Sequence, residues 1–84
     1  MFILAIGSLL KPQETAAHMA DEARVLAELR AEGLVKQSFR YRDRPGVVSI
    51  LEAASVDEAR AKMGRLPFVR LGITSFELSE LVEF

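Results

Sequence analysis

The chain has 84 residues, half of them hydrophobic and 27% charged, a balance typical of a globular domain and not of a disordered tail. Eleven basic and twelve acidic residues give a net charge of -1, so the basic excess expected of a general nucleic-acid binder is missing. The absence of cysteine excludes disulfides, thiolate metal sites and a cysteine nucleophile, and the single histidine, His18, excludes a multi-histidine metal site within one chain.

The length predicts one domain spanning residues 1–84, with a core thin enough that self-association is expected. The longest apolar run, Phe2 to Ile6, is too short to cross a bilayer. The first residues also lack the basic region of a signal peptide. We therefore expect a cytoplasmic protein with no membrane or nucleic-acid partner.

The first half of the chain predicts a strand followed by a long helix. Residues Phe2 to Leu9 are apolar over a length that suits a strand. Residues Glu14 to Glu32 are rich in helix-forming types, contain no Gly or Pro, and precede Gly33 where a C-terminal cap glycine belongs. On a helical wheel one face is apolar and the opposite face is charged, which predicts packing against a sheet.

A hairpin is predicted next. Residues 35–42 form its first strand, with Val35, Gln37, Phe39 and Tyr41 on one face and Lys36, Ser38, Arg40 and Arg42 on the other. Residues 43–46 contain Pro and Gly in a turn arrangement, and residues 47–53 form the returning strand.

The last third predicts a second helix and a fourth strand. Ser55 and Glu58 have the spacing of a capping box, the helix runs to about Arg65, and Leu66-Pro67 ends it. Residues 73–82 form the last strand. The resulting order, β-α-β-β-α-β, is a ferredoxin-like α+β arrangement in which two helices cover one sheet face. The other face also carries apolar residues, and a second subunit packed sheet to sheet would cover them.

Glu22 is the residue whose position best suggests chemistry. It falls on the helical wheel between Leu26 and Leu29, so its carboxylate points toward the core. Burial raises the pKa of a carboxylate, which is what a general base needs. The alternative is a carboxylate at the edge of the apolar face that reaches solvent or pairs with an arginine.

Other candidates have simpler alternatives beside them. His18 lies four residues before Glu22 and could assist it as an acid, or be an ordinary helix histidine. The cations of the first hairpin strand could bind a substrate carboxylate, or pair with Glu52 or Glu77. Tyr41 could donate a hydrogen bond to a ligand, or lie in the core. No glycine-rich phosphate loop, metal-ligand spacing or framed serine nucleophile occurs, so no cofactor is expected.

Several short motifs resemble the muconolactone isomerase family. The spacing between Asp21 and Pro67 matches that family without a gap, over a little more than half of the chain. The matching residues are Ala20-Asp21-Glu22, Glu32-Gly33, Phe39-Arg40, Ser49, Ser55 to Ala59, and Leu66-Pro67.

The resemblance implies a ferredoxin-like unit that forms a homodimer and can assemble further. It also implies a cofactor-independent proton shift in a small unsaturated lactone of aromatic breakdown. Glu22 would then be the catalytic base with His18 assisting, and Arg40, with its neighbours Phe39 and Tyr41, would contact the substrate.

This sequence departs from the family where histidine or aromatic residues are replaced by Val35, Gln37 and Arg44. The alternative function is a non-catalytic small-ligand-binding protein, or an accessory or cyclase-type barrel of a small-molecule pathway.

Overall fold

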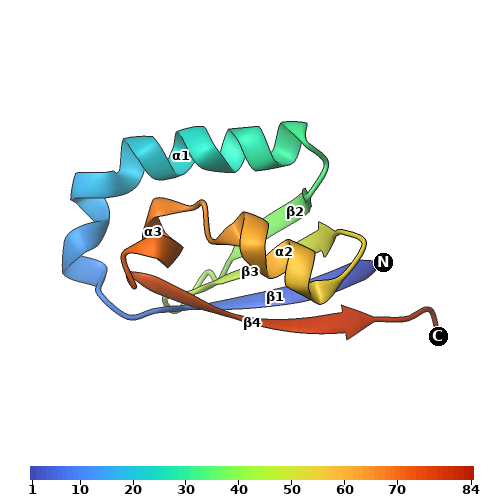
Figure 1. Cartoon of the computed structure of the whole chain (residues 1–84). Helices are drawn as coiled ribbons and strands as arrows, with labels where there is room; N and C mark the ends of the chain where they lie inside the picture. Colours follow the sequence, from blue (N-terminus) through green and yellow to red (C-terminus); the bar gives the residue numbers. More distant parts are fainter.

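The computed structural model describes all residues from 1 to 84 and contains one four-stranded sheet with its helices on one face (Figure 1). The elements, in chain order, are β1 (Phe2–Leu9), the 3-10 turn η1 (Pro12–Glu14), α1 (Thr15–Ala31), β2 (Val35–Arg40), β3 (Val47–Glu52), α2 (Val56–Met63), α3 (Pro67–Arg70) and β4 (Thr74–Leu81). No helix combines the length and apolar character that a bilayer span would need.

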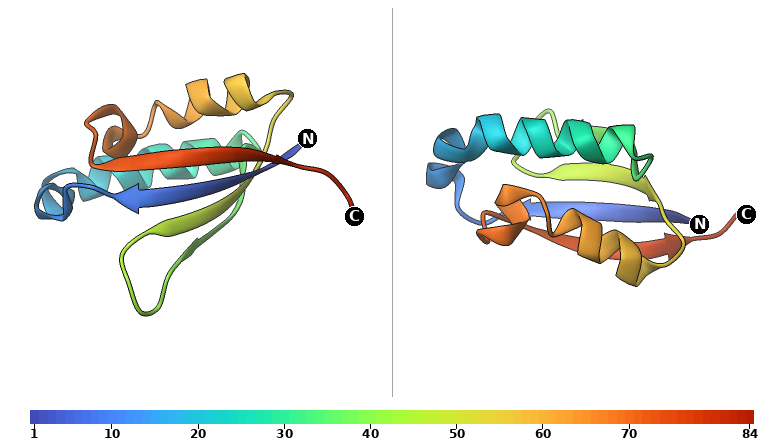
Figure 2. Two further views of the ribbon diagram at one scale, coloured as in Figure 1. Left: turned by 90° about the horizontal axis from the view of Figure 1, so that it is seen from below. Right: turned by 45° about the horizontal axis from the view of Figure 1, so that its top comes forward.

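The sheet confirms the predicted ferredoxin-like α+β fold. Its strand order is β2-β3-β1-β4 and all neighbouring strands are antiparallel. Figure 2 shows the helices on one side of this sheet and the tip of the β2–β3 hairpin extending beyond the other strands. The central strand β1 ends between the start of β4 and the start of β3, directly after the hairpin turn, so that end of the sheet has residues from three different segments.

The core lies between the sheet and the helices, where apolar side chains of both layers are removed from water. Six large side chains are less than 2% exposed: Ile3, Leu29, Leu34, Leu51, Leu66 and Ile73. α1 contributes Val25 and Leu29, while Met19, an apolar residue of the same helix, is 52% exposed. The packed face of α1 is therefore rotated toward Val25 and Leu29, and Glu22 lies within it.

Local signals in the sequence correspond to the observed helix ends and turns. Gly33 follows α1 with a φ of +87°, a conformation that L side chains rarely adopt. The capping box is present, because Ser55 Oγ accepts a hydrogen bond from the Glu58 N–H at 3.0 Å. The Glu58 carboxylate in turn accepts one from the backbone N–H of Ala54.

The strict alternation predicted for the first hairpin strand is wrong. Val35 pairs with Leu51 but Gln37 pairs with Ile50, so a bulge at Lys36 shifts the register. Arg40 consequently lies on the helix-facing side with Val47. Lys36 instead forms an ion pair of 3.1 Å with Glu52, the alternative considered for these cations. The strand also ends at Arg40 and not at residue 42.

The sheet face that points away from the helices is apolar along its centre. The register places Phe2, Leu4 and Ile6 of β1 on this face, beside residues of β3. Phe2 is 48% and Ile6 38% exposed, although both are large apolar side chains. Phe39 of β2 joins this surface opposite Val48. A continuous exposed apolar surface of this kind usually marks an interaction site.

Candidate active site

A cavity of about 440 Å³ lies between the sheet and the N-terminal half of α1. Its wall combines the end of β1, one side of α1, the β2–β3 hairpin, α3 and the start of β4. The lining residues are Gly7, Leu9, Thr15, Met19, Glu22, Leu26, Arg40, Tyr41, Arg44, Pro45, Gly46, Val47, Phe68, Thr74 and Phe76. An apolar hollow with a few converging polar groups is the usual form of a small-molecule site.

Glu22 brings the only carboxylate into this wall. It is half-buried, and its Oε1 accepts a hydrogen bond of 2.9 Å from the backbone N–H of Phe68. The other oxygen, Oε2, accepts no hydrogen bond from the protein. Because no buried side-chain oxygen or nitrogen lacks a partner, this free oxygen is accessible to solvent. One oxygen is thus fixed by the fold and the other is available to a ligand.

The surroundings of Glu22 raise its pKa above the ordinary value of 4.5. Removal of the carboxylate from water is the main cause, since burial disfavours the charged form. The hydrogen bond from Phe68 favours the charged form and offsets part of this effect. The result is a carboxyl group that holds a proton more readily than a surface glutamate does, which suits proton transfer.

The short helix α3 supplies the partner of Glu22, and the sequence did not predict it. Pro67 stands at its first position, where a proline costs no hydrogen bond, and Phe68 follows. Backbone N–H groups in the first turn of a helix have no partner within the helix. Glu22, on the neighbouring helix α1, provides the missing acceptor for Phe68.

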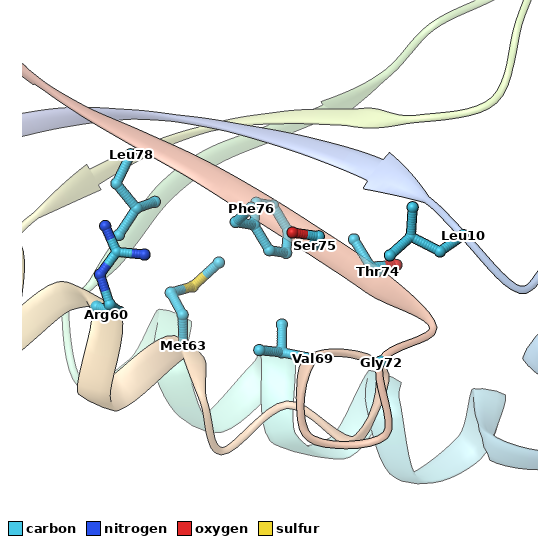
Figure 3. Close-up of a pocket in the computed structure, with 9 residues that line it drawn as sticks. All are labelled: Leu10, Arg60, Met63, Val69, Gly72, Thr74, Ser75, Phe76 and Leu78. Carbon is cyan, nitrogen blue, oxygen red and sulfur yellow. The ribbon is translucent and has the colours of Figure 1, made fainter.

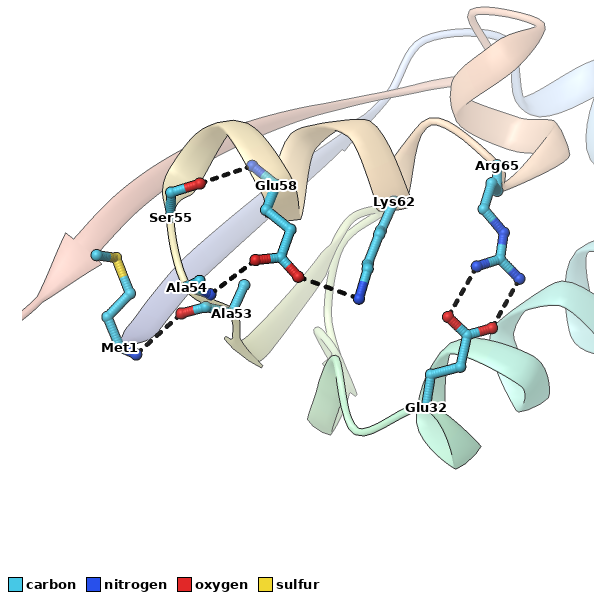
Figure 4. A network of polar contacts seen from close by, with 8 residues as sticks. All are labelled: Met1, Glu32, Ala53, Ala54, Ser55, Glu58, Lys62 and Arg65. Atoms are coloured by element: carbon cyan, nitrogen blue, oxygen red, sulfur yellow. Dashed lines mark hydrogen bonds and ion pairs between the residues drawn. The ribbon is translucent and has the colours of Figure 1, made fainter.

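A polar network fixes the segment that leads into α3 (Figure 4). Arg65 donates two hydrogen bonds of 2.9 Å to the carboxylate of Glu32 at the end of α1. This bidentate contact lowers the pKa of Glu32. In the preceding helix α2, Glu58 forms an ion pair with Lys62 at 3.2 Å. Since these groups are solvent-exposed, the network adds little to the free energy of folding, and its main effect is to hold the segment before α3 in place.

The hairpin places three polar side chains at the mouth of the cavity. Arg40 ends β2, and no acidic group forms an ion pair with it. Tyr41 is half-buried, and the guanidinium of Arg44 stacks on its ring with 3.9 Å between Cζ and the ring centroid. Gly46, with a φ of +123°, lets this ring lie against the turn, because a Cβ there would come 3.1 Å from the ring.

Gly7 sets the shape of the inner wall. It lies opposite Val47 of β3 and Phe76 of β4, and a Cβ at Gly7 would come within 2.8 Å of both side chains. Phe76 and Thr74 also line a second, smaller cavity of about 340 Å³ between β4 and the helices α2 and α3 (Figure 3). These two residues therefore form the partition between the cavities.

The structure brings some of the predicted site residues together and separates others. Glu22, Arg40 and Tyr41 share one cavity. His18 is half-buried one turn earlier on α1, outside the lining, and makes no hydrogen bond with Glu22. Phe39 lies on the opposite face of the sheet and is 55% exposed. Outside the cavity, no group of three or more acidic or histidine side chains gathers in a metal-binding arrangement.

Sequence reasoning missed Arg44 and Phe68 as members of the site. Arg44 lies in a turn, where strand alternation gives no direction for a side chain. Phe68 contributes its backbone N–H, which no side-chain pattern reveals. The Pro at the first position of α3 was the available signal for that helix, because proline is common at helix starts as well as after helix ends.

Comparison with known proteins supplies a family. The family model described as muconolactone delta-isomerase matches residues 3–77. No curated protein matches the sequence significantly. Among solved structures, muconolactone isomerase is similar with a TM-score of 0.80 and 18% identity, covering 100% of this chain and 91% of that chain.

Two further structures share the fold. The first is 5-chloro-2-hydroxyhydroquinone dehydrochlorinase from Burkholderia phenoliruptrix, in complex with 2,5-dihydroxybenzoquinone. Its TM-score is 0.71 at 20% identity, with 100% of this chain and 96% of that chain covered. The second, a protein from Agrobacterium tumefaciens, has a TM-score of 0.54 at 17% identity over 100% and 96% of the two chains.

Proposed function

The chain belongs to the muconolactone delta-isomerase family, and on that premise we propose that it catalyses a cofactor-independent proton shift in a small unsaturated lactone or related acid. The observation that carries the proposal is Glu22, a half-buried carboxylate with a raised pKa and one free oxygen in an apolar cavity. Such a group can remove a proton from carbon at neutral pH and keep it long enough to return it.

The proposed reaction uses the two oxygens of Glu22 differently. Oε1 stays hydrogen-bonded to Phe68, and Oε2 takes a proton from the ring carbon that lies between the carbon–carbon double bond and the ring oxygen. The electron pair left behind delocalises into the lactone carbonyl as an enolate. The protonated carboxyl then returns the same proton to the ring carbon next to the carbonyl, and the double bond moves to the position beside the ring oxygen. Substrate and product therefore have the same composition.

Arg40 and Tyr41 are proposed to orient the substrate. Arg40 reaches the cavity without an acidic partner, so its planar guanidinium is free to bind a carboxylate through two hydrogen bonds. Tyr41, half-buried at the rim, can donate its hydroxyl proton to a ligand oxygen. His18 and Phe39 have no part in this proposal, because neither lines the cavity.

A non-catalytic ligand-binding role is the second candidate, and the contact between Glu22 and Phe68 favours it. That hydrogen bond alone explains why the Glu22 carboxylate lies at the start of α3, without any catalytic role. In this case the cavity would bind a small acid without converting it, and loss of the carboxylate charge would leave binding intact.

The two functions are separated by NMR of muconolactone in deuterated buffer. We expect isomerisation or deuterium incorporation with the wild type and a loss of about 100-fold or more with Glu22→Gln. Asp21→Asn is the matched control, because Asp21 is the adjacent, exposed carboxylate outside the cavity. Turnover that survives in Glu22→Gln would refute Glu22 as the base. A wild type that binds but never exchanges a proton would favour the binding role.

We also propose that two copies of the chain associate through the exposed apolar sheet face. Phe2, Ile6 and Phe39 on this surface are each more than a third exposed, and a second copy would remove them from water. Ile6→Lys, which adds a charge at the centre of the face, is expected to give monomers in analytical ultracentrifugation. Arg24→Gln on the outer side of α1 serves as control and should remain dimeric. A monomeric wild type at micromolar concentration would contradict the proposal.

A further inference from the structure

Arg44 is exposed, yet its contact with Tyr41 and the shape of the turn define its position at the cavity. Its guanidinium stacks on the Tyr41 ring at 3.9 Å, within the range of a cation–π interaction. The ring itself rests against the turn at Gly46, where a side chain would collide with it. The adjacent Pro45 restricts the backbone of the same turn. The fold thus holds a cation at the mouth of the cavity.

The charges that line the cavity are unbalanced. Only three lining residues are ionisable at neutral pH, namely Glu22, Arg40 and Arg44. Two of them are permanently positive, whereas the chain as a whole has a net charge of -1. The nearest acid, Asp43, contacts Arg44 Nη1 at 3.3 Å, but both side chains are more than half exposed. An exposed pair of this kind contributes little, so a ligand anion can replace Asp43.

We propose that Arg44 is a second anion-binding residue of this cavity, and that Arg40 and Arg44 together select ligands with two acidic groups joined by an apolar centre. The two arginines belong to different parts of the hairpin, Arg40 to the end of β2 and Arg44 to the turn, and both line the cavity. Leu26, Phe68 and Phe76 are among the apolar residues that line the same cavity. A dicarboxylate fits this pattern, as does a carboxylate joined to an enolate or phenolate oxygen.

The inference rests on the proposed function only in taking the same cavity as the substrate site. Under that function, one arginine would hold the substrate carboxylate while the other faces the enolate oxygen that forms during the proton shift. Positive groups placed where negative charge develops stabilise such an intermediate. Arg44 is therefore a specificity-determining residue whose effect is measurable without turnover.

The test compares the binding of adipate and hexanoate, which differ in one carboxylate, by NMR titration at constant ionic strength. We expect the wild type to bind adipate roughly fivefold to tenfold more tightly than hexanoate, in line with one additional charge-assisted contact at a partly exposed site. Arg44→Gln should reduce this ratio to about twofold or less. Arg42→Gln is the matched control, since Arg42 is an exposed cation of the same hairpin outside the lining, and it should keep the ratio.

Three results would overturn the inference: no preference in the wild type, a preference that survives Arg44→Gln, or an equal loss in Arg42→Gln. An equal loss in Arg42→Gln would mean that the total positive charge of the hairpin causes the preference, and not a direct contact between Arg44 and the ligand. Glu22→Gln separates this inference from the proposed function, because it should abolish turnover while keeping the adipate preference. A protein that prefers adipate but never isomerises a lactone would refute only the reaction.

Discussion

The packing around Gly7 allows a quantitative prediction for Gly7→Ala. A Cβ at this position would lie 2.7 Å from Val47 Cγ2 and 2.8 Å from Phe76 Cε1. Nonbonded carbons are most stable at about 3.5–4.0 Å, so each neighbour would have to retreat by roughly 0.8 Å. Neither can do so freely, because Val47 is in the sheet and Phe76 forms the partition between two cavities.

Overpacking of this kind costs about 1–3 kcal/mol in folding free energy. For a chain of this size, each kcal/mol corresponds to a shift of about 4–8 °C in Tm. The expected decrease in Tm for Gly7→Ala is therefore at least roughly 4 °C, measured by circular dichroism during heating. Urea unfolding measures the corresponding loss of folding free energy. The control is Gly64→Ala, because Gly64 has an ordinary φ of -64° and its nearest heavy atom would be Ala61 O at 3.3 Å.

Gly64→Ala is expected to change the free energy of unfolding by less than about 1 kcal/mol, because alanine fits the helical φ of the half-buried Gly64 and loses less conformational freedom on folding than glycine. Equal stability of the two variants would show that the sheet adapts to a methyl group at Gly7 and that the argument from contact distances is wrong. Because Phe76 must move, Gly7→Ala should also weaken hexanoate binding in the main cavity. Unchanged affinity would mean that the ring moves toward the second cavity.

Three further outcomes are expected. The pKa of Glu22 is higher in the folded than in the unfolded state, so its contribution to stability is complete below about pH 4.5 and is lost as pH rises through the raised folded pKa. In urea unfolding, the stability of Glu22→Gln relative to wild type should therefore increase from pH 4 to pH 7. A stability difference that stays constant over this range would refute the raised pKa. Ser55→Ala removes the acceptor for the Glu58 N–H and should cost about 1 kcal/mol, whereas Ser79→Ala, at an exposed position of β4, should be nearly neutral. Gly46→Ala places a side chain at a φ of +123° and against the Tyr41 ring, so we expect a loss of about 1–3 kcal/mol, with the Tyr41 ring resonances shifted in NMR spectra; unshifted resonances would show that the ring does not depend on the turn.

The parts of the fold that the sequence predicted depend on interactions within a few residues. The cap at Gly33, the box formed by Ser55 and Glu58, and the apolar strand at the N-terminus are each specified locally. The bulge at Lys36 is not, because its position depends on which residues of β3 face the core. The four residues of α3 are too few to show a helical period, and only Pro67 marked their start.

The residues of the candidate site also separate into those that a local pattern predicts and those that depend on contacts between segments. The helical period correctly directed Glu22 inward, because α1 is long enough for its packed face to be evident. Arg40 required the bulge to reach the cavity side, and the uninterrupted alternation assigned it to a face shared with Lys36. Arg44 depends on a turn whose geometry follows from Gly46 and on a ring, Tyr41, that lies beyond the end of the strand. Contacts between segments, which no local pattern contains, therefore decide the composition of the site.

The structural role of Glu22 can be separated from its proposed chemical role, because the two use different oxygens. Glu22→Gln retains an amide oxygen that can accept the Phe68 N–H, whereas Glu22→Ala removes the acceptor and leaves that N–H to water in the cavity. Both variants lack the desolvated charge, so their difference in stability isolates the hydrogen bond and the packing of the side chain. We expect Glu22→Ala to be about 1–2 kcal/mol less stable than Glu22→Gln in urea unfolding at pH 7. Equal stabilities would mean that the hydrogen bond from Phe68 to Glu22 does not stabilise α3, and the structural role of Glu22 would be refuted.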